Sequence, residues 1–275
     1  MTIASAPTIG YLRGMEVVVL GSGSRGNAYL FRSGGTSVLV DAGVPPKALR
    51  ARFHDATGDE LRLDAVVLSH GHNDHAGCAE ATARAFEAPL YMTRSTERAL
   101  RPASDIRVKL FAPRAGFRVG ALDLFPLPVP HDAPQVALVV EHDGRRAGLA
   151  TDLGHVRADL VGHFSGCSTV LIESNYDPQL LACSPYPASV QDRVSSHRGH
   201  LSNGQAAGLI RQLDRGLRTV VLVHLSEQNN EPELAAACVK DALQGRRIDI
   251  RVARGSQPLR VPVSVAPHQM RLDFR

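Results

Sequence analysis

Short apolar runs recur along the chain and dominate its pattern. They are rich in valine, isoleucine and leucine, and glycine, aspartate or proline residues bound them. Such runs are typical of buried β-strands, because branched side chains suit a pleated surface and the bounding residues favour turns. The pattern predicts strands over residues 15–21, 27–33, 36–43, 64–70, 88–92, 106–111, 123–129, 136–144, 146–152, 168–174, 218–226 and 248–254.

Helical patterns lie between some of these strands. Asn203 and the pair Glu231–Pro232 suit helix starts, and Gly216 and Gly245 suit helix ends. The pattern predicts helices over residues 45–54, 76–86, 94–101, 203–214 and 230–243.

Strands dominate the first part of the chain, and strands alternate with helices in the last part. This order favours one α/β domain over residues 15–275, with two sheets packed face to face and helices outside. We expect residues 1–14 to form a disordered leader, because Met15 directly precedes the first strand. Either Met1 or Met15 could then be the native start.

The composition narrows the class of protein. The chain has 275 residues, of which 44% are hydrophobic and 21% charged, as in ordinary globular proteins. It contains no apolar run of membrane-spanning length and no secretion signal, so we expect a cytoplasmic protein. A net charge of +4 is compatible with a polyanionic partner. The four cysteines lack C-x-x-C spacing, and we expect them to be reduced; for Cys78, close to a histidine cluster, metal ligation is weighed against a packing role.

That cluster is the strongest chemical signal in the sequence. The segment VLSHGHNDHAG places His70, His72, Asp74 and His75 within six positions, just after an apolar run. On one helix these side chains would point in several directions, but on a loop between a strand and a helix they can converge. Imidazole and carboxylate groups are ligands of zinc and similar metals, so the spacing predicts a metal site.

The H-x-H-x-D-H spacing resembles the signature of the metallo-β-lactamase superfamily. The resemblance implies a four-layer αββα sandwich with a dinuclear metal site along one edge of its two sheets. It also implies two further histidines and a bridging aspartate, each following an apolar run. By resemblance, one metal is bound by His70, His72 and His131, the second by Asp74, His75 and His224, and Asp152 bridges the two.

Four further segments, LGSGSRGN, LIESN, GHLSN and HLSEQNN, resemble the YycJ (WalJ) branch of this superfamily, which is related to tRNase Z. The similarity runs from about residue 15 to residue 255. It implies a 5′→3′ double-stranded DNA exonuclease that uses a metal-activated water. No inserted β-CASP domain and no long exosite arm are evident, which argues against transfer-RNA processing.

This resemblance suggests roles for individual residues. Asp74 is expected to orient the nucleophile and handle its proton. His200 is expected to stabilise phosphoryl charge or protonate the leaving oxygen. Glu173 would orient His200, with a strand-end salt bridge as its alternative. The expected substrate contacts come from the rest of the site: Arg193, Ser24 and Asn27, with Arg198 and Ser22 as weaker candidates.

Other functions remain open at this point. A small-molecule or cyclic-nucleotide phosphodiesterase would use the same metals, while a thioester or lactone hydrolase would have less need of His200. A binding protein with structural metals is disfavoured, because closed structural zinc sites favour cysteine ligands. The expected cofactors are two divalent ions, zinc or manganese with iron as a further option, and the expected partner is nucleic acid, with DNA favoured.

Overall fold

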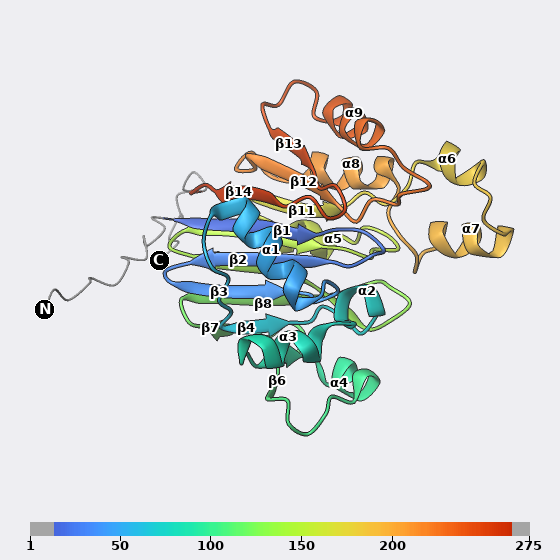
Figure 1. Ribbon diagram of the computed structural model, residues 1–275. Coiled ribbons are helices and arrows are strands. Elements are labelled where there is room, and N and C mark those ends of the chain that lie inside the picture. The colour runs from blue at the N-terminus through green and yellow to red at the C-terminus, as the bar shows by residue number, and fades with distance from the viewer. Residues whose placement is uncertain (1–13, 266–275) are drawn as a thin grey trace, which may run out of the picture.

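The computed structural model describes residues 14–265, and Figure 1 shows two sheets stacked face to face with helices on both outer sides. This arrangement confirms the predicted four-layer αββα sandwich. Of the leader expected over residues 1–14, all but Gly14 lies outside the described residues. The single domain expected over residues 15–275 stays a prediction.

Within residues 14–265, the first sheet has seven strands in the order β14-β1-β2-β3-β4-β5-β6. The strands from β14 to β3 are antiparallel to their neighbours, and those from β3 to β6 are parallel. Their bounds are β1 Met15–Gly21, β2 Ala28–Ser33, β3 Thr36–Val40, β4 Ala65–Val67, β5 Leu90–Met92, β6 Val108–Leu110 and β14 Leu259–Val263.

The second sheet repeats this plan with seven strands of the described chain in the order β13-β12-β11-β10-β9-β8-β7. The strands from β13 to β10 are parallel, and those from β10 to β7 are antiparallel. Their bounds are β7 Phe117–Val119, β8 Leu122–Val129, β9 Gln135–His142, β10 Arg145–Ala150, β11 Thr169–Glu173, β12 Thr219–Val223 and β13 Asp249–Val252.

The helices cover the outer faces of these sheets. In the described residues they are α1 Pro46–Thr57, α2 Asn73–Ala76, α3 Ala79–Phe86, α4 Arg94–Leu100, α5 Ala158–His163, α6 Pro178–Ala182, α7 Ala188–Ser195, α8 Asn203–Gln212 and α9 Pro232–Ala242. Helices α1 and α3 contact the first sheet, and α5 and α9 contact the second. Figure 1 shows α6 and α7 projecting to one side of the sandwich.

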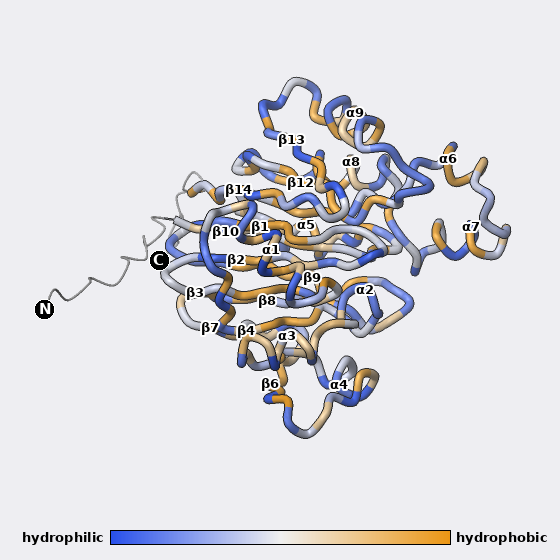
Figure 2. The backbone as a smooth tube through the Cα atoms, in the orientation of Figure 1, coloured by the Kyte–Doolittle hydropathy of each residue, from blue (hydrophilic) through white to orange (hydrophobic). Residues whose placement is uncertain are grey.

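Three apolar clusters fill the three spaces between the four layers. Val17 and Val19 of β1 face the cluster between the sheets, while Val18 and Leu20 face the cluster beneath α1. A third cluster lies between the second sheet and α5, α8 and α9. Because both faces of each sheet are covered, the strands read as continuous apolar runs, visible as orange stretches in Figure 2. This double burial explains the sequence pattern.

Some predicted elements differ from the observed ones. Helices α8 and α9 start at the expected residues but end before Gly216 and Gly245. The sequence pattern missed α5, α6 and α7, which have five to eight residues each, too few turns to show a helical period. It also missed β7 and β14; β14 contains a proline and lies at an edge of its sheet, where proline is tolerated.

Among residues 14–265, no helix combines the length and the apolar character that crossing a bilayer requires. The cysteines in this part of the chain are all free, as expected.

The strand directions bring the polar residues of the predicted site to one edge of the sandwich. Strand β3 ends next to Asp41, and its parallel neighbour β4 leads to His70. In the second sheet, β8, β10, β11 and β12 all run in the same direction. Their carboxyl ends lead to His131, Asp152, Glu173 and His224 at this shared edge.

Gly43 lets the backbone after β3 pass close to α2. Its N–H donates to the carbonyl oxygen of Asn27 at 3.0 Å, and the N–H of Asn27 donates to that of Asp74 at 2.8 Å. A Cβ atom at position 43 would overlap the carbonyl oxygen of Asp74. The glycine therefore fixes how closely α2 approaches the first sheet.

We expect Gly43→Ala to lower the free energy of unfolding by about 1–3 kcal/mol, because α2 must move to relieve the overlap. Urea unfolding measures this change. Gly208→Ala in α8 is the control, since a methyl group there meets no atom within 4 Å and removes a flexible residue from a helix. Equal losses in both variants would show that the approach of α2 does not depend on Gly43.

Candidate metal centre

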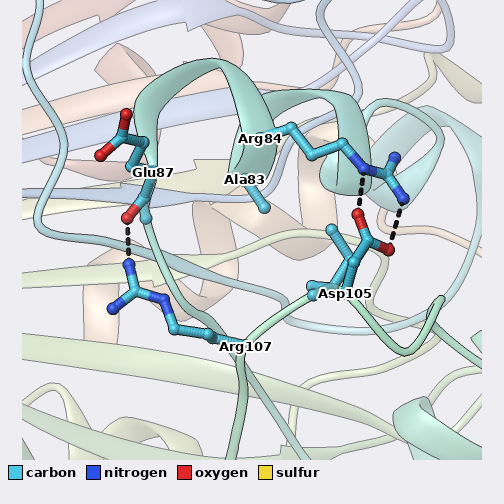
Figure 3. Close-up of a pocket in the computed structure, with 7 residues that line it drawn as sticks. Ala83, Arg84, Glu87, Asp105 and Arg107 are labelled. Atoms are coloured by element: carbon cyan, nitrogen blue, oxygen red, sulfur yellow. Dashed lines mark hydrogen bonds and ion pairs between the residues drawn. The ribbon is translucent and has the colours of Figure 1, made fainter.

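Two surface cavities are candidates for a functional site. The larger, about 460 Å³, lies between α3 and the start of β6, and ion-paired or hydrogen-bonded side chains line it. Figure 3 shows Arg84 paired there with Asp105. The smaller, about 200 Å³, lies at the edge where the histidines converge, and His72, Asp74, His131, Asp152, His200 and His224 line it. The smaller cavity is therefore the candidate functional site, because the predicted metal-binding histidines and acids line it.

Three residues reach this edge through an uncommon backbone conformation. Asp41, Asp152 and His224 follow β3, β10 and β12 with φ angles of 62°, 54° and 55°. This left-handed region costs a non-glycine residue about 1–3 kcal/mol and is concentrated at functional sites. Here it turns the chain sharply at the strand end and directs each side chain into the site.

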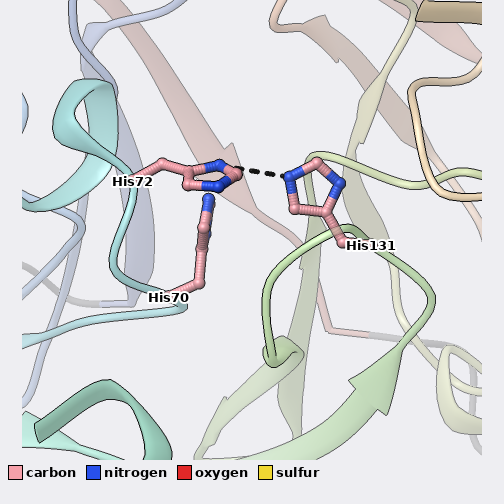
Figure 4. Close-up of side chains that lie close together, drawn as sticks. All are labelled: His70, His72 and His131. Atoms are coloured by element: carbon pink, nitrogen blue, oxygen red, sulfur yellow. Dashed lines mark hydrogen bonds between the residues drawn. The ribbon is translucent and has the colours of Figure 1, made fainter. Parts of the chain in front are cut away.

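His70, His72 and His131 form the first group of possible ligands. Their ligand nitrogens lie within 4.8 Å of one another, and Figure 4 shows the three rings converging. Nδ1 of His72 lies 3.2 Å from Nε2 of His131. Nε2 of His70 is buried without a hydrogen-bond partner, as a nitrogen reserved for a cation would be.

Asp74, His75 and His224 form the second group. Oδ2 of Asp74 lies 3.4 Å from Nε2 of His75 and 3.4 Å from Nε2 of His224. Asp74 and His75 come from the single turn α2, whereas His224 comes from the opposite sheet. This group therefore spans both halves of the sandwich.

Asp152 lies between the two groups. Its Oδ2 is 2.7 Å from Nε2 of His75 and 3.5 Å from Nε2 of His70, and its Oδ1 is 2.9 Å from Nδ1 of His224. The carboxylate is buried, yet neither oxygen has a hydrogen-bond partner of acceptable geometry. Buried carboxylates normally pair with cations or coordinate metals. These donors therefore fit divalent cations, and Asp152 is placed where it could contribute to either group of ligands.

The charged groups around Asp152 shift one another's pKa values. Burial alone would lower the pKa of His75, but the carboxylates of Asp152 and Asp41 outweigh it and raise that pKa well above the usual range. Burial would raise the pKa of Asp152, but His224 and His75 outweigh it and lower that pKa. The pKa of His70 falls to about 2, through burial and through repulsion from the other histidines. His70 therefore keeps a free nitrogen lone pair.

A layer of acids behind the histidines fixes their orientation. Asp41 is completely buried, and its Oδ2 lies 2.7 Å from Nδ1 of His75. It also accepts hydrogen bonds from the backbone N–H and the hydroxyl of Ser69. Oε1 of Glu173 lies 2.8 Å from Nδ1 of His224 and 2.8 Å from Nδ1 of His200. Such partners fix the ring position and tautomer of metal-binding histidines.

The structure brings the seven residues of the predicted ligand set together at one edge, and Glu173 lies next to His200 in the same site. Ser24 and Arg193 line the cavity. Asn27 differs from expectation: it is completely buried, and its Nδ2 lies 2.9 Å from Nε2 of His75. Its amide also lies 3.3 Å from Oδ2 of Asp74, on the side of the ring that faces the other ligands. Asn27 is not among the residues that line the cavity, so it contacts the ligands rather than the space where a substrate would bind. Ser22 is also buried, where it accepts a hydrogen bond from the backbone N–H of His224.

The sequence analysis missed two acids, Asp41 and Asp132. Asp41 lies near the end of the predicted strand 36–43, as Asp152 ends the predicted strand 146–152, and that position was an available signal. Asp132 is the neighbour of His131, and only the fold shows that it also approaches His72.

Comparison with known proteins shows what this chain is similar to. Residues 36–225 match the family model described as a beta-lactamase superfamily domain. The chain is 28% identical over 264 residues to an exodeoxyribonuclease WalJ of Streptococcus pneumoniae, covering 91% of this chain and 98% of that one. It is 29% identical over 238 residues to an exodeoxyribonuclease YycJ of Bacillus anthracis, covering 84% of this chain and 90% of that one.

Among solved structures, the metallo-beta-lactamase fold protein YhfI of Bacillus subtilis is similar with a TM-score of 0.69. It is 18% identical in sequence, and the alignment covers 90% of this chain and 99% of that one. At this identity the similarity supports the fold.

Metal binding should stabilise the protein, because it satisfies the buried carboxylate and the unpaired ring nitrogens. At a hundredfold excess of Zn²⁺ or Mn²⁺ over Kd, we expect Tm to rise by roughly 5–10 °C and EDTA to reverse the rise. Differential scanning fluorimetry measures this shift.

Asp152→Ala should abolish most of that rise in Tm, because it removes the carboxylate that lies between the two groups of possible ligands. Asp159→Ala, which removes an acid from surface ion pairs with Arg114 and Arg157, is the control and should keep the rise. A full metal-dependent rise in Asp152→Ala would contradict a role of Asp152 in metal binding.

Proposed function

The chain belongs to the β-lactamase superfamily, and from that premise we propose that it is a metal-dependent nuclease that hydrolyses phosphodiester bonds in DNA. Two relatives aligned over most of the chain are named exodeoxyribonucleases, which supports DNA as the substrate. The resemblance to the YycJ (WalJ) branch extends the proposal to 5′→3′ removal of nucleotides from a duplex. The cytoplasmic location stays a prediction.

The position of His200 carries the proposal. It shares the 200 Å³ cavity with the metal ligands, and its Nδ1 is held by the buried Glu173 at 2.8 Å. The other ring nitrogen, Nε2, is then left for a bound substrate. Burial would lower the pKa of His200, but Glu173 outweighs it and raises the pKa to about 9. A protonated imidazole there would stabilise a phosphoryl oxygen or donate its proton to the leaving oxygen.

Asp74 and Arg193 complete the proposed machinery. The carboxylate of Asp74 is partly exposed to the cavity and would orient an attacking water and accept its proton. Arg193, at the rim, would bind a backbone phosphate, with Ser24 close to the same substrate. The bound cations would neutralise charge on the phosphodiester and lower the pKa of a bound water molecule toward neutral pH. The nitrogen and oxygen donors suit zinc or manganese, with iron as a further option.

The direct test supplies the metal-loaded protein with 5′-phosphorylated, end-labelled duplex DNA. Single-stranded RNA and bis-nitrophenyl phosphate are supplied in parallel, and Asp74→Ala serves as the blank. Stepwise shortening of the duplex from its 5′ end is the expected result. Cleavage of bis-nitrophenyl phosphate alone would overturn the DNA assignment and favour a small-molecule phosphodiesterase.

His200→Ala should reduce kcat for DNA by about 10²- to 10⁴-fold, the usual contribution of a general acid, while metal binding is retained. Single-turnover cleavage and metal content measure the two effects separately. His54→Ala, at an exposed position of α1, is the matched control and should cleave normally. An unchanged rate in His200→Ala would exclude the acid role.

A further inference from the structure

Asp132 contacts several residues of the site, although the proposed mechanism gives it no role. Its Oδ1 lies 3.2 Å from Nε2 of His72 and 3.2 Å from Nε2 of His131. Its Oδ2 lies 2.8 Å from Nη2 of Arg193 and 3.3 Å from its Nε. One carboxylate therefore contacts both the first group of metal ligands and an arginine from a distant part of the chain.

His72 is the ligand of the first group that most needs support. Its side chain is 36% exposed, whereas those of His70 and His131 are 0% and 2% exposed. Packing therefore holds the other two rings but leaves His72 free on one side. With Nδ1 directed at His131, Nε2 is the nitrogen left for a supporting partner, and Asp132 is the acid that lies there.

Arg193 lies on a segment with few ties to the rest of the fold. Residues 178–195, called the arm here, comprise α6, α7 and their connection, and Figure 1 shows them projecting from the sandwich. Helix α7 has no buried residue. Within residues 14–265, the ion pair between Arg193 and Asp132 is the salt bridge that joins α7 to the sandwich.

We propose that Asp132 is a positioning residue: it holds the His72 ring for metal binding and holds Arg193 of the arm over the cavity for a substrate phosphate. Carboxylates that hold metal-binding histidines contribute strongly to metal affinity. A guanidinium held in place also loses less freedom when it binds a phosphate. The Arg193 part of this proposal rests on the proposed function, whereas the His72 part does not.

Three variants separate the two contacts. Asp132→Ala removes both. Asp132→Asn keeps an oxygen for Nε2 of His72 but removes the charge that holds Arg193. Arg193→Gln removes the arginine and leaves His72 supported. Asp105→Asn breaks the exposed Arg84–Asp105 pair seen in Figure 3, at the other cavity, and is the matched control.

Metal binding tests the His72 contact without any measurement of activity. Competition with a chromophoric chelator should show one metal site weakened about 10- to 100-fold in Asp132→Ala. Asp132→Asn, Arg193→Gln and the control should stay within about threefold of the unsubstituted protein. The visible absorption spectrum of the Co²⁺-loaded protein should change in Asp132→Ala alone.

Two results would overturn the His72 part. Unchanged metal affinity in Asp132→Ala would show that the ring needs no such support. Equal losses in Asp132→Ala and Asp132→Asn would make Asp132 a metal ligand instead. If Asp132→Ala does not fold, as judged by circular dichroism, Asp132→Leu takes its place, because leucine fills similar space but supplies no oxygen to Nε2 of His72. Its metal affinity should fall about 10- to 100-fold, and an unchanged affinity would overturn the His72 part.

Kinetics on duplex DNA test the Arg193 contact. Asp132→Asn and Arg193→Gln should each raise KM about tenfold, with kcat within about twofold. Only Arg193→Gln removes a phosphate contact outright, so it alone should lower the slope of log Kd against log salt by about one. An unchanged KM in either variant, or a lower KM in Asp132→Asn, would overturn this part. Failure of the unsubstituted protein to cleave DNA would overturn the proposed function and leave the metal results standing.

Discussion

The burial of Asp152 between two sheets is the constraint on which the site depends. Its carboxylate has no hydrogen-bond partner of acceptable geometry, and ring nitrogens of four histidines lie within 3.5 Å of it: His70, His75, His200 and His224. An ionised carboxylate in such surroundings is costly unless positive charge compensates it. His70 and His75 follow strand β4 of the first sheet, while Asp152 and His224 follow strands β10 and β12 of the second. The same electrostatic requirement that demands a cation therefore also joins the two halves of the sandwich.

Both sheets place polar residues at this edge in the same way. Each contains parallel strands whose carboxyl ends carry the polar residues, and the covered faces leave that edge as the place where polar groups can gather. The left-handed conformations of Asp41, Asp152 and His224 are a local cost that the surrounding sheets sustain. Because the strands fix the backbone, the ligands are held in position before any cation binds.

Acids control the histidines from several sides. Asp41 and Glu173 are fully buried and hold His75, His224 and His200 from behind. Asp132 lies on the open side, next to His72 and the projecting arm. The rigid side of the site therefore belongs to the sheets, while the substrate side belongs to loops and to α7, where relatives of one fold can differ most easily.

The sequence by itself determined the ligand chemistry, because four of the donors lie within six residues and their types and spacing are local properties. It also determined most strands, because strands that are buried on both faces have continuous apolar sequences. Tertiary structure decided what depends on residues far apart in the chain. Glu173 contacts both His200 and His224, Asn27 contacts His75, and Asp132 reaches Arg193. The short helices α5 to α7 also escaped the pattern, because one or two turns carry too little periodicity to identify a helix.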